Sequence, residues 1–267
     1  MILLLIVIGI FTGILAGVFG IGGGTLFTPV LFILFTSLGV EQPVAWTIGT
    51  SLFCTFTAAS SSSIQQLKQK NMFGREGIKV GLFGAAGVFI GKQISTSAIY
   101  TEQIFVTFFA CLLILVAWMF YRRGKSEKIV TERTSAIGTK KTAVTGLGGG
   151  FVAALAGVGG GVVVVPVLNL IYKINISKAV SVSSLAVLVI SLSGWLQFAL
   201  LSGQVAGATG FTLGFVDFGT GFPLIIGAFI GGFFGVKLGE KMTQDRRQVA
   251  FSVLAIIIAL IMIYTIL

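Results

Sequence analysis

Two apolar runs of this chain are each interrupted by a cluster of glycines that is followed by a proline. The first cluster is Gly20–Gly24 with Pro29 after it, and the second is Gly157–Gly161 with Pro166 after it. As one straight helix, residues 2–37 would extend about 54 Å, whereas the hydrocarbon core of a bilayer is about 30 Å thick. We therefore expect the chain to turn at the glycines, inside the membrane, and to form a hairpin of short helices.

The composition requires a membrane environment. Of the 267 residues, 55% are hydrophobic and 10% are charged, whereas a soluble domain contains about 25% charged residues. Apolar segments close to the ~18–20 residues that span a bilayer recur along the whole sequence, and they are continuous rather than alternating. The sequence therefore predicts an all-α polytopic membrane protein and excludes a transmembrane β-barrel.

The apolar segments form two similar series, which indicates an internal repeat. Each series consists of a short segment, the glycine cluster, a second short segment and three full spans. We expect a first membrane repeat at 1–122, a cytoplasmic linker at 123–141 and a second membrane repeat at 142–267. The expected segments are 2–20, 24–37, 44–66, 78–96 and 103–121, then 142–157, 161–173, 178–201, 220–238 and 248–266.

The number of crossings and the basic residues both predict inverted-topology repeats. Each repeat crosses the membrane an odd number of times, whether its hairpin counts as two crossings or as none. Every Lys and Arg except Lys92 lies in, or at the edge of, one of four loops: Lys68–Lys79, Arg122–Lys141, Lys173–Lys178 and Lys237–Arg247. Because Lys and Arg are enriched in cytoplasmic loops, we expect these loops inside and both termini outside, in a bacterial inner (cell) membrane. Nucleic-acid binding is disfavoured, since the basic residues form no folded face.

The glycine clusters offer a site for an anion. Glycine adopts backbone conformations closed to other residues, and a helix that restarts at Gly24 or Gly161 exposes unpaired N–H groups and its positive dipole end. Such an end binds anions without a buried cation, and duplicated breaks are typical of a transporter's central site. The alternative is that the glycines only permit close helix packing, which we expect for the Gly-x-x-x-Gly pairs in Gly87–Gly91 and Gly231–Gly235. A P-loop is excluded because neither cluster is followed by the required lysine.

Hydroxyl side chains occur at matching places in the two repeats. Thr50 and Ser51 correspond to Ser183 and Ser184, and Thr25 follows the first glycine cluster. They are candidates to donate to one shared ligand, although each could instead bond a carbonyl one turn back. The candidate substrate-binding residues are Gly22, Gly23, Gly24, Thr25, Thr50, Ser51, Gly159, Gly160, Gly161, Ser183 and Ser184.

The scarcity of acidic residues inside the predicted spans favours an anionic substrate, because a cation carrier usually keeps a carboxylate at mid-depth. The sequence contains no His and no His/Cys/Asp cluster that would hold a metal or supply a general base. We therefore expect no enzyme activity, no cofactor and no metal. The hypothesis is a secondary transporter of a small anion; an anion channel and a non-transporting membrane scaffold are the alternatives. The coupling ion (proton or sodium) and the oligomeric state are not indicated.

These features resemble the sulfite exporter TauE/SafE family, a duplicated membrane domain, over essentially the whole chain. The resemblance is carried by Gly17–Gly24 with Pro29 and by Ala156–Gly161 with Pro166, together with the paired Thr/Ser positions. One departure is Gln65-Gln-Leu-Lys68, where many members have a His. The resemblance implies passage of small sulfur-containing anions such as sulfite, thiosulfate or organosulfonates. We expect the substrate to be held mid-membrane between the two glycine clusters and to cross by alternating access.

Overall fold

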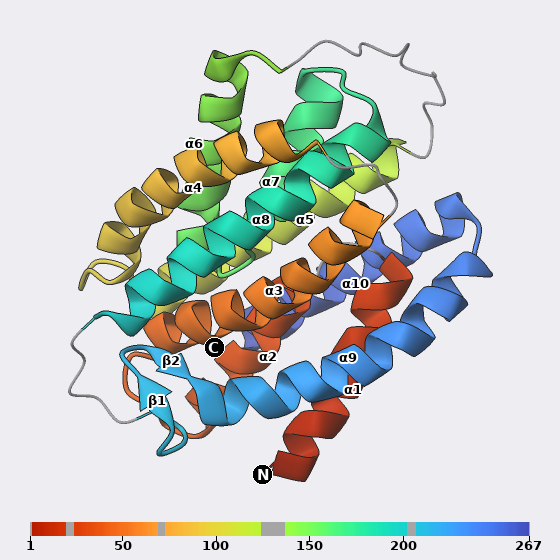
Figure 1. Cartoon of the computed structure of the whole chain (residues 1–267). Helices are drawn as coiled ribbons and strands as arrows, with labels where there is room; N and C mark the ends of the chain where they lie inside the picture. The colour runs from red at the N-terminus through yellow and green to blue at the C-terminus, as the bar shows by residue number, and fades with distance from the viewer. Residues whose placement is uncertain (1, 20–23, 69–72, 124–136, 202–206, 267) are drawn as a thin grey trace.

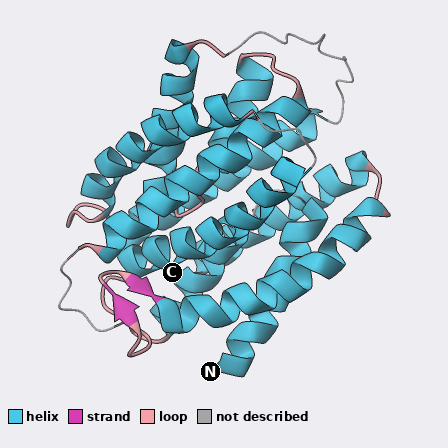
Figure 2. Ribbon diagram, in the orientation of Figure 1, coloured by secondary structure: helices cyan, strands magenta, loops and turns pink. Residues whose placement is uncertain are grey.

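The computed structural model describes residues 2–19, 24–68, 73–123, 137–201 and 207–266, and these are almost entirely helical (Figures 1 and 2). The first half contains α1 (Ile2–Phe19), α2 (Gly24–Ser37), α3 (Pro43–Lys68), α4 (Gly74–Ser95) and α5 (Glu102–Arg123). The second half contains α6 (Thr139–Ala156), α7 (Gly161–Pro166), the π-helix η1 (Val167–Ile171), α8 (Ile176–Ala199), α9 (Phe218–Glu240) and α10 (Gln244–Thr265). A short antiparallel hairpin of β1 (Thr212–Leu213) and β2 (Val216–Asp217) precedes α9. The prediction of an all-α polytopic membrane protein is confirmed.

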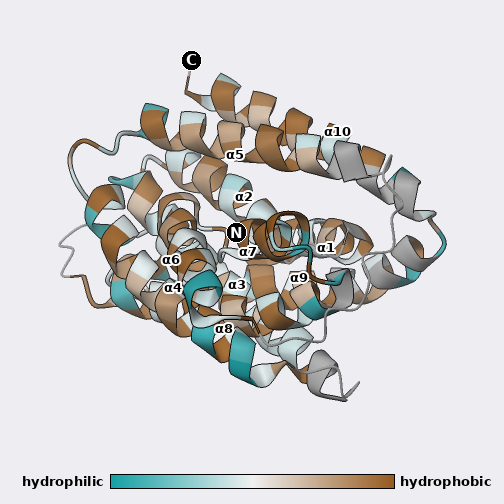
Figure 3. Ribbon diagram, turned by 90° about the horizontal axis from the view of Figure 1, so that it is seen from above, coloured by the Kyte–Doolittle hydropathy of each residue, from teal (hydrophilic) through white to brown (hydrophobic). Residues whose placement is uncertain are grey.

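Four of the described helices, α4, α5, α8 and α9, contain segments that are long and apolar enough to cross a membrane. Apolar segments of 10–17 residues lie in α1, α2, α7–η1 and α10. Exposed hydrophobic side chains lie on α1, α4, α5, α9 and α10 among other helices, and much of the ribbon is coloured brown for hydrophobic residues in Figure 3. Exposed apolar side chains on so many helices are what a lipid environment requires, because hydrocarbon replaces water around them.

Helix α3 is long enough to cross a membrane but is less apolar than the four helices α4, α5, α8 and α9, although the sequence predicted a full span over 44–66. The reason is its content of Ser and Thr. These hydroxyls are tolerated because α3 is enclosed by protein: residues 43–55 are all buried, and α2, α8 and α9 pack around the helix. Polar side chains inside a membrane protein face the bundle interior rather than lipid, so α3 is the central polar helix of the fold.

The two halves pack reciprocally. Helix α1 lies along α9, and its counterpart α6 lies along α4, the counterpart of α9. The corresponding helices α3 and α8 contact each other, as do α5 and α10. Two copies related by a pseudo-two-fold axis would pack in this way. The inversion of the repeats itself stays a prediction, as do the boundaries of the linker, of which 124–136 lie outside the described residues.

Glycines bring the reciprocal helix pairs into backbone contact. A Cβ atom added at Gly231 or Gly235 of α9 would overlap the backbone oxygens of Ile10 and Ile14 in α1. A Cβ added at Gly87 of α4 would overlap a backbone oxygen of α6. The close helix approach expected for the Gly-x-x-x-Gly pairs is therefore present, and the glycines permit it because they carry no side chain.

The loops without Lys or Arg gather at one end of the molecule. The α2–α3 and α4–α5 connections line one cavity, and the ring of Phe215 in the β1–β2 hairpin lies 5.4 Å from that of Trp46 near the start of α3. At the other end, the Phe73 N–H, just before α4, donates to the Ser181 hydroxyl of α8 (3.4 Å). The α1–α2 hairpin thus opens toward the first end and the α6–η1 hairpin toward the second. Which end faces the cytoplasm stays a prediction.

Candidate functional site

The second glycine cluster forms a sharp reversal between α6 and α7. Gly157, Gly159 and Gly160 all have left-handed backbone conformations, with φ values of 71°, 67° and 79°. Residues other than glycine adopt such angles only under strain. Helix α6 ends where the Gly157 N–H donates to Ala153 O (2.8 Å), and α7 restarts with Val163 and Val164 N–H groups bonded to Gly160 O. The predicted break in the apolar run is therefore a real interruption of the helix.

Gly24, the last residue of the first glycine cluster, meets the second cluster. Gly22 and Gly23 lie outside the described residues, but α2 begins at Gly24. A Cβ atom added at Gly24 would lie 2.8 Å from Val158 O and 2.8 Å from the Thr55 hydroxyl oxygen of α3. The start of α2 is thus packed directly against the second cluster, with no room for a methyl group between them. We call Gly24, Thr28, Ser51, Thr55 and Gly157–Gly159 the junction.

Three hydroxyl contacts tie the junction together. The Ser51 hydroxyl of α3 donates to Gly157 O (2.9 Å) and lies 2.9 Å from the Thr28 hydroxyl of α2. The Thr28 hydroxyl also lies 3.0 Å from Gly24 O, to which it donates. Each hydroxyl has only one hydrogen, so two hydrogens serve three contacts. Ser51 therefore links both hairpins through a hydrogen-bond set that has more than one arrangement.

One group of the other predicted residues lies in the junction or beside it: Thr25, Gly159, Gly161 and Ser183. Thr25 is buried with its hydroxyl unpartnered among the described residues. Gly159 lies against Thr55, whose Cγ2 is 2.5 Å from the position of an added Cβ. The corresponding position at Gly161 is 3.7 Å from the Ser183 hydroxyl oxygen. These contacts place Gly159 within the junction and bring Ser183 close to the start of α7.

Thr50 and Ser184 make structural contacts instead. The Thr50 hydroxyl accepts a hydrogen bond from the Asp217 N–H (3.0 Å) at the end of β2. It does not point the same way as Ser51, because neighbouring residues on a helix are about 100° apart. The Ser184 hydroxyl donates to Val180 O, one turn back (3.0 Å). Gly160 lies behind the turn, where an added Cβ would be 2.7 Å from Gly149 O of α6.

Sequence reasoning missed Thr28 and Thr55 as junction residues. Their counterparts in the second repeat, Val165 and Leu188, are apolar, so matching the two repeats does not select them. The signal that identifies them is helical spacing: Thr55 follows Ser51 by four residues, and Thr28 follows Gly24 by four residues. Residues four apart lie on one helix face, so each pair faces the same side.

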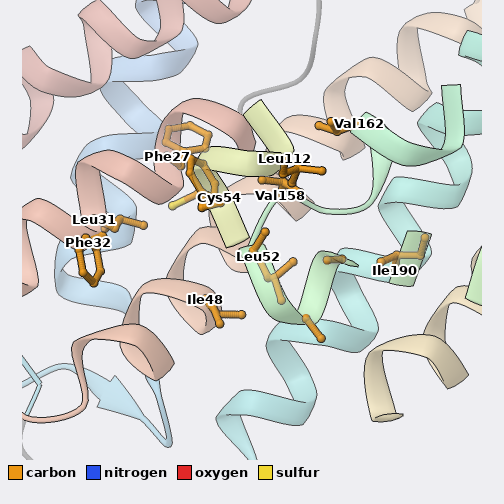
Figure 4. Packing of buried hydrophobic residues seen from close by; sticks show 14 of the residues in the cluster. Phe27, Leu31, Phe32, Ile48, Leu52, Cys54, Leu112, Val158, Val162 and Ile190 are labelled. Carbon is orange, nitrogen blue, oxygen red and sulfur yellow. The ribbon is translucent and has the colours of Figure 1, made fainter. Parts of the chain in front are cut away.

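The junction obtains its polarity without ionised side chains. The buried charged residues among those described are Lys178 and Asp217. The Lys178 ammonium lies 4.5 Å from the centre of the Phe73 ring at one end, and the Asp217 carboxylate accepts from the Thr209 and Thr220 N–H groups at the other. Val158 of the junction packs in the same apolar core cluster as Phe27, Leu52 and Cys54 (Figure 4). Hydroxyls and peptide dipoles therefore act in surroundings of low dielectric constant, where they are strongest.

A cavity of about 580 Å³ opens at the end without Lys or Arg. Its wall includes Tyr100, whose hydroxyl donates to Leu155 O (3.0 Å), two residues before Gly157. Burial raises the pKa of Tyr100 well above its ordinary value, so the phenol keeps the proton that it donates. The cavity wall is thereby bonded to the α6 arm of the second hairpin.

Comparison with known proteins relates this chain to one family and to several probable membrane transporters. The family described as "Sulfite exporter TauE/SafE" matches residues 5–262. A probable membrane transporter protein of Methanocaldococcus jannaschii is 29% identical over 195 residues, which cover 73% of this chain and 71% of the relative. The probable membrane transporter protein YunE of Bacillus subtilis is 26% identical over 219 residues, covering 76% and 79%. No solved structure matches the chain significantly. The chain belongs to the sulfite exporter TauE/SafE family.

Proposed function

We propose that this protein is a secondary transporter that carries a small sulfur-containing anion and binds it at the junction. The observation that carries the proposal is the contact of Gly24, which ends the first glycine cluster, with the second cluster among buried residues. Irregular backbone inside a membrane protein is tolerated where it is buried in protein or lines a cavity. The family match and the names of the relatives support transport and a sulfur oxyanion.

The packing at the junction supports transport by alternating access. The start of α2 and the turn at Val158 touch, with no space for even one methyl group between them, so a substrate is admitted only when the hairpins separate. The cavity beside Tyr100 is the route from one end, and its hydrogen bond to Leu155 O couples that end to the second hairpin. Rocking of the two repeats about the junction would expose it to either end in turn.

The direct test is reconstitution of the full chain into lipid vesicles, with sulfite, thiosulfate or methanesulfonate as substrate. A transporter gives uptake above empty vesicles that saturates with concentration. Flux that does not saturate, with single-channel currents, would identify an anion channel instead. Flux equal to that of empty vesicles, with a folded protein, would favour a membrane scaffold and contradict the proposal.

Tyr100→Phe should alter transport moderately without loss of folded protein. The substitution removes one hydrogen bond to Leu155 O but keeps the ring, which packs 6.4 Å from that of Phe105. A neutral hydrogen bond contributes about 0.5–1.5 kcal/mol, so the initial rate should change roughly 2- to 10-fold. Tyr264→Phe is the control, because Tyr264 is 81% exposed on α10. An equal effect of both substitutions would show that the Tyr100 hydroxyl does not couple the cavity to the second hairpin.

A further inference from the structure

Two buried threonine hydroxyls, that of Thr55 in the junction and that of Thr25 next to Gly24 in the chain, have no partner in the described part of the chain. Thr25 and Thr55 are 2% and 3% exposed, and the hydroxyl oxygen of each is buried without a hydrogen bond. That of Thr55 is directed at the start of α2, because it lies 2.8 Å from the Cβ position of Gly24. A buried hydroxyl without a partner is unfavourable, so these two groups are suited to a ligand that accepts hydrogen bonds.

The start of α2 supplies further donors at the same place. Helix α2 has 14 residues, and its first N–H groups have no acceptor within the helix. Those groups carry a partial positive charge of roughly half an elementary unit. The unpartnered Thr55 hydroxyl and the N-terminus of α2 therefore converge on one point, where they favour an acceptor with negative charge.

The attraction at this point is that of a dipole rather than of a cation. Lys178, the buried basic residue of the described chain, lies near one end of the molecule with its ammonium over Phe73. Asp217, the buried acidic one, lies near the other end and is bonded to Thr209 and Thr220. The desolvation penalty of an ion in a low-dielectric site grows with the square of its charge. Attraction to a fixed dipole grows only in proportion to charge, so the balance of attraction against desolvation is less favourable for a doubly charged anion than for a singly charged one.

A carbonyl oxygen adds to this discrimination. Val158 O lies 2.8 Å from the same Cβ position of Gly24, so one side of the point presents an acceptor. An acceptor repels an additional oxyanion charge but accommodates an O–H group or an apolar substituent of the ligand. Among sulfur anions, hydrogen sulfite carries an O–H group and a sulfonate carries an organic substituent.

We infer that the junction selects singly charged sulfur anions, namely sulfonates and hydrogen sulfite, over doubly charged sulfate and thiosulfate, with Thr55 as a specificity-determining donor. The inference rests on the proposed function and narrows its substrate class. It assigns to Thr55 a donor role that the predicted candidates Thr50 and Ser184 do not have, since the hydroxyls of those two are bonded within the protein.

The test measures initial uptake of methanesulfonate, sulfite, sulfate and thiosulfate by vesicles that contain the full chain. Methanesulfonate and sulfite should enter at least about 10-fold faster than either dianion at equal concentration. Lowering the external pH should raise the rate for sulfite, as more of it becomes hydrogen sulfite, and leave the rate for methanesulfonate unchanged. Equal or faster uptake of sulfate or thiosulfate would overturn the charge selection while the transporter assignment stands. No uptake of any of the four anions would overturn the proposed function itself.

The role of Thr55 is tested with three variants. Thr55→Val removes the hydroxyl at nearly constant shape and should lower methanesulfonate uptake about 10-fold, whereas Thr55→Ser should restore it. Thr57→Val on the same helix is the matched control, because the Thr57 hydroxyl donates to Phe53 O within α3. If Thr55→Val does not fold, Thr25→Val serves instead, since the second repeat has Val162 at that place. Full activity of folded Thr55→Val or Thr25→Val would exclude that residue as a ligand donor.

Discussion

Gly24→Ala is expected to abolish transport while the protein still folds. The added methyl group would lie 2.8 Å from Val158 O, 2.9 Å from Val158 C and 2.8 Å from the Thr55 hydroxyl oxygen. Two of these atoms belong to the backbone of the second glycine cluster, which is held in a left-handed turn and cannot retreat freely. The start of α2 must therefore move away. A displacement of about 1 Å in a binding site can reduce a rate about 100-fold, and we expect at least that loss in vesicle uptake.

Gly232→Ala is the matched control for this substitution. Gly232 is also helical, but the nearest atom to its added Cβ would be Gly13 O at 3.8 Å, an ordinary contact. The control should transport at the normal rate and be at least as stable, because alanine favours a helix more than glycine does. Size-exclusion chromatography of both variants separates misfolding from loss of function. Normal uptake by folded Gly24→Ala would show that the meeting of the two clusters is not the site of transport.

The layout of the helices could be predicted because membrane thickness and glycine chemistry act locally. A run of 36 residues from 2 to 37 cannot cross a bilayer as one helix, and glycine is the residue that permits a turn. The structure agrees, since α2 restarts at Gly24 and α7 at Gly161. The central position of α3 could not be predicted from its length and average hydropathy. It follows from the packing of α2, α8 and α9 around its hydroxyls.

The candidate site was only partly predictable, because correspondence between the repeats is not the same as contact. Thr50 and Ser51 were equivalent candidates in the sequence, yet Ser51 reaches Gly157 O and Thr50 accepts from the Asp217 N–H. Which of two adjacent helical residues faces a site depends on the rotation of the helix, and packing against the other half sets that rotation. Contacts between residues more than 100 positions apart leave no local pattern in a single sequence.

Asp217 shows that the burial of a loop residue is equally hard to predict from the sequence. The sequence places it in an outer loop before an apolar span, where an exposed carboxylate is the ordinary expectation. In the structure it is fully buried, and its oxygens accept from the N–H groups of Thr209 and Thr220. Thr220 lies in the first turn of α9, so the carboxylate satisfies one of the unpaired N–H groups there. Burial was not foreseeable, because the two partners lie 8 residues before and 3 residues after Asp217, a spacing that follows no regular pattern in the sequence.

Gly150→Ala should strongly destabilise the fold. A Cβ at Gly150 of α6 would overlap the backbone oxygen and Cα of Gly84 in α4, and neither atom can move without displacing a helix. Overpacking costs about 1–3 kcal/mol and occasionally more, and we expect the upper part of that range because backbone meets backbone. The measurement is the apparent melting temperature in detergent. Gly148→Ala, two residues earlier on the same helix, has no atom within 4 Å of its added Cβ and should melt at or above the temperature of the unmodified protein. Equal melting temperatures for the two variants would mean that α4 and α6 are not held in backbone contact, and the reciprocal packing of the two halves would then lack one of its backbone contacts.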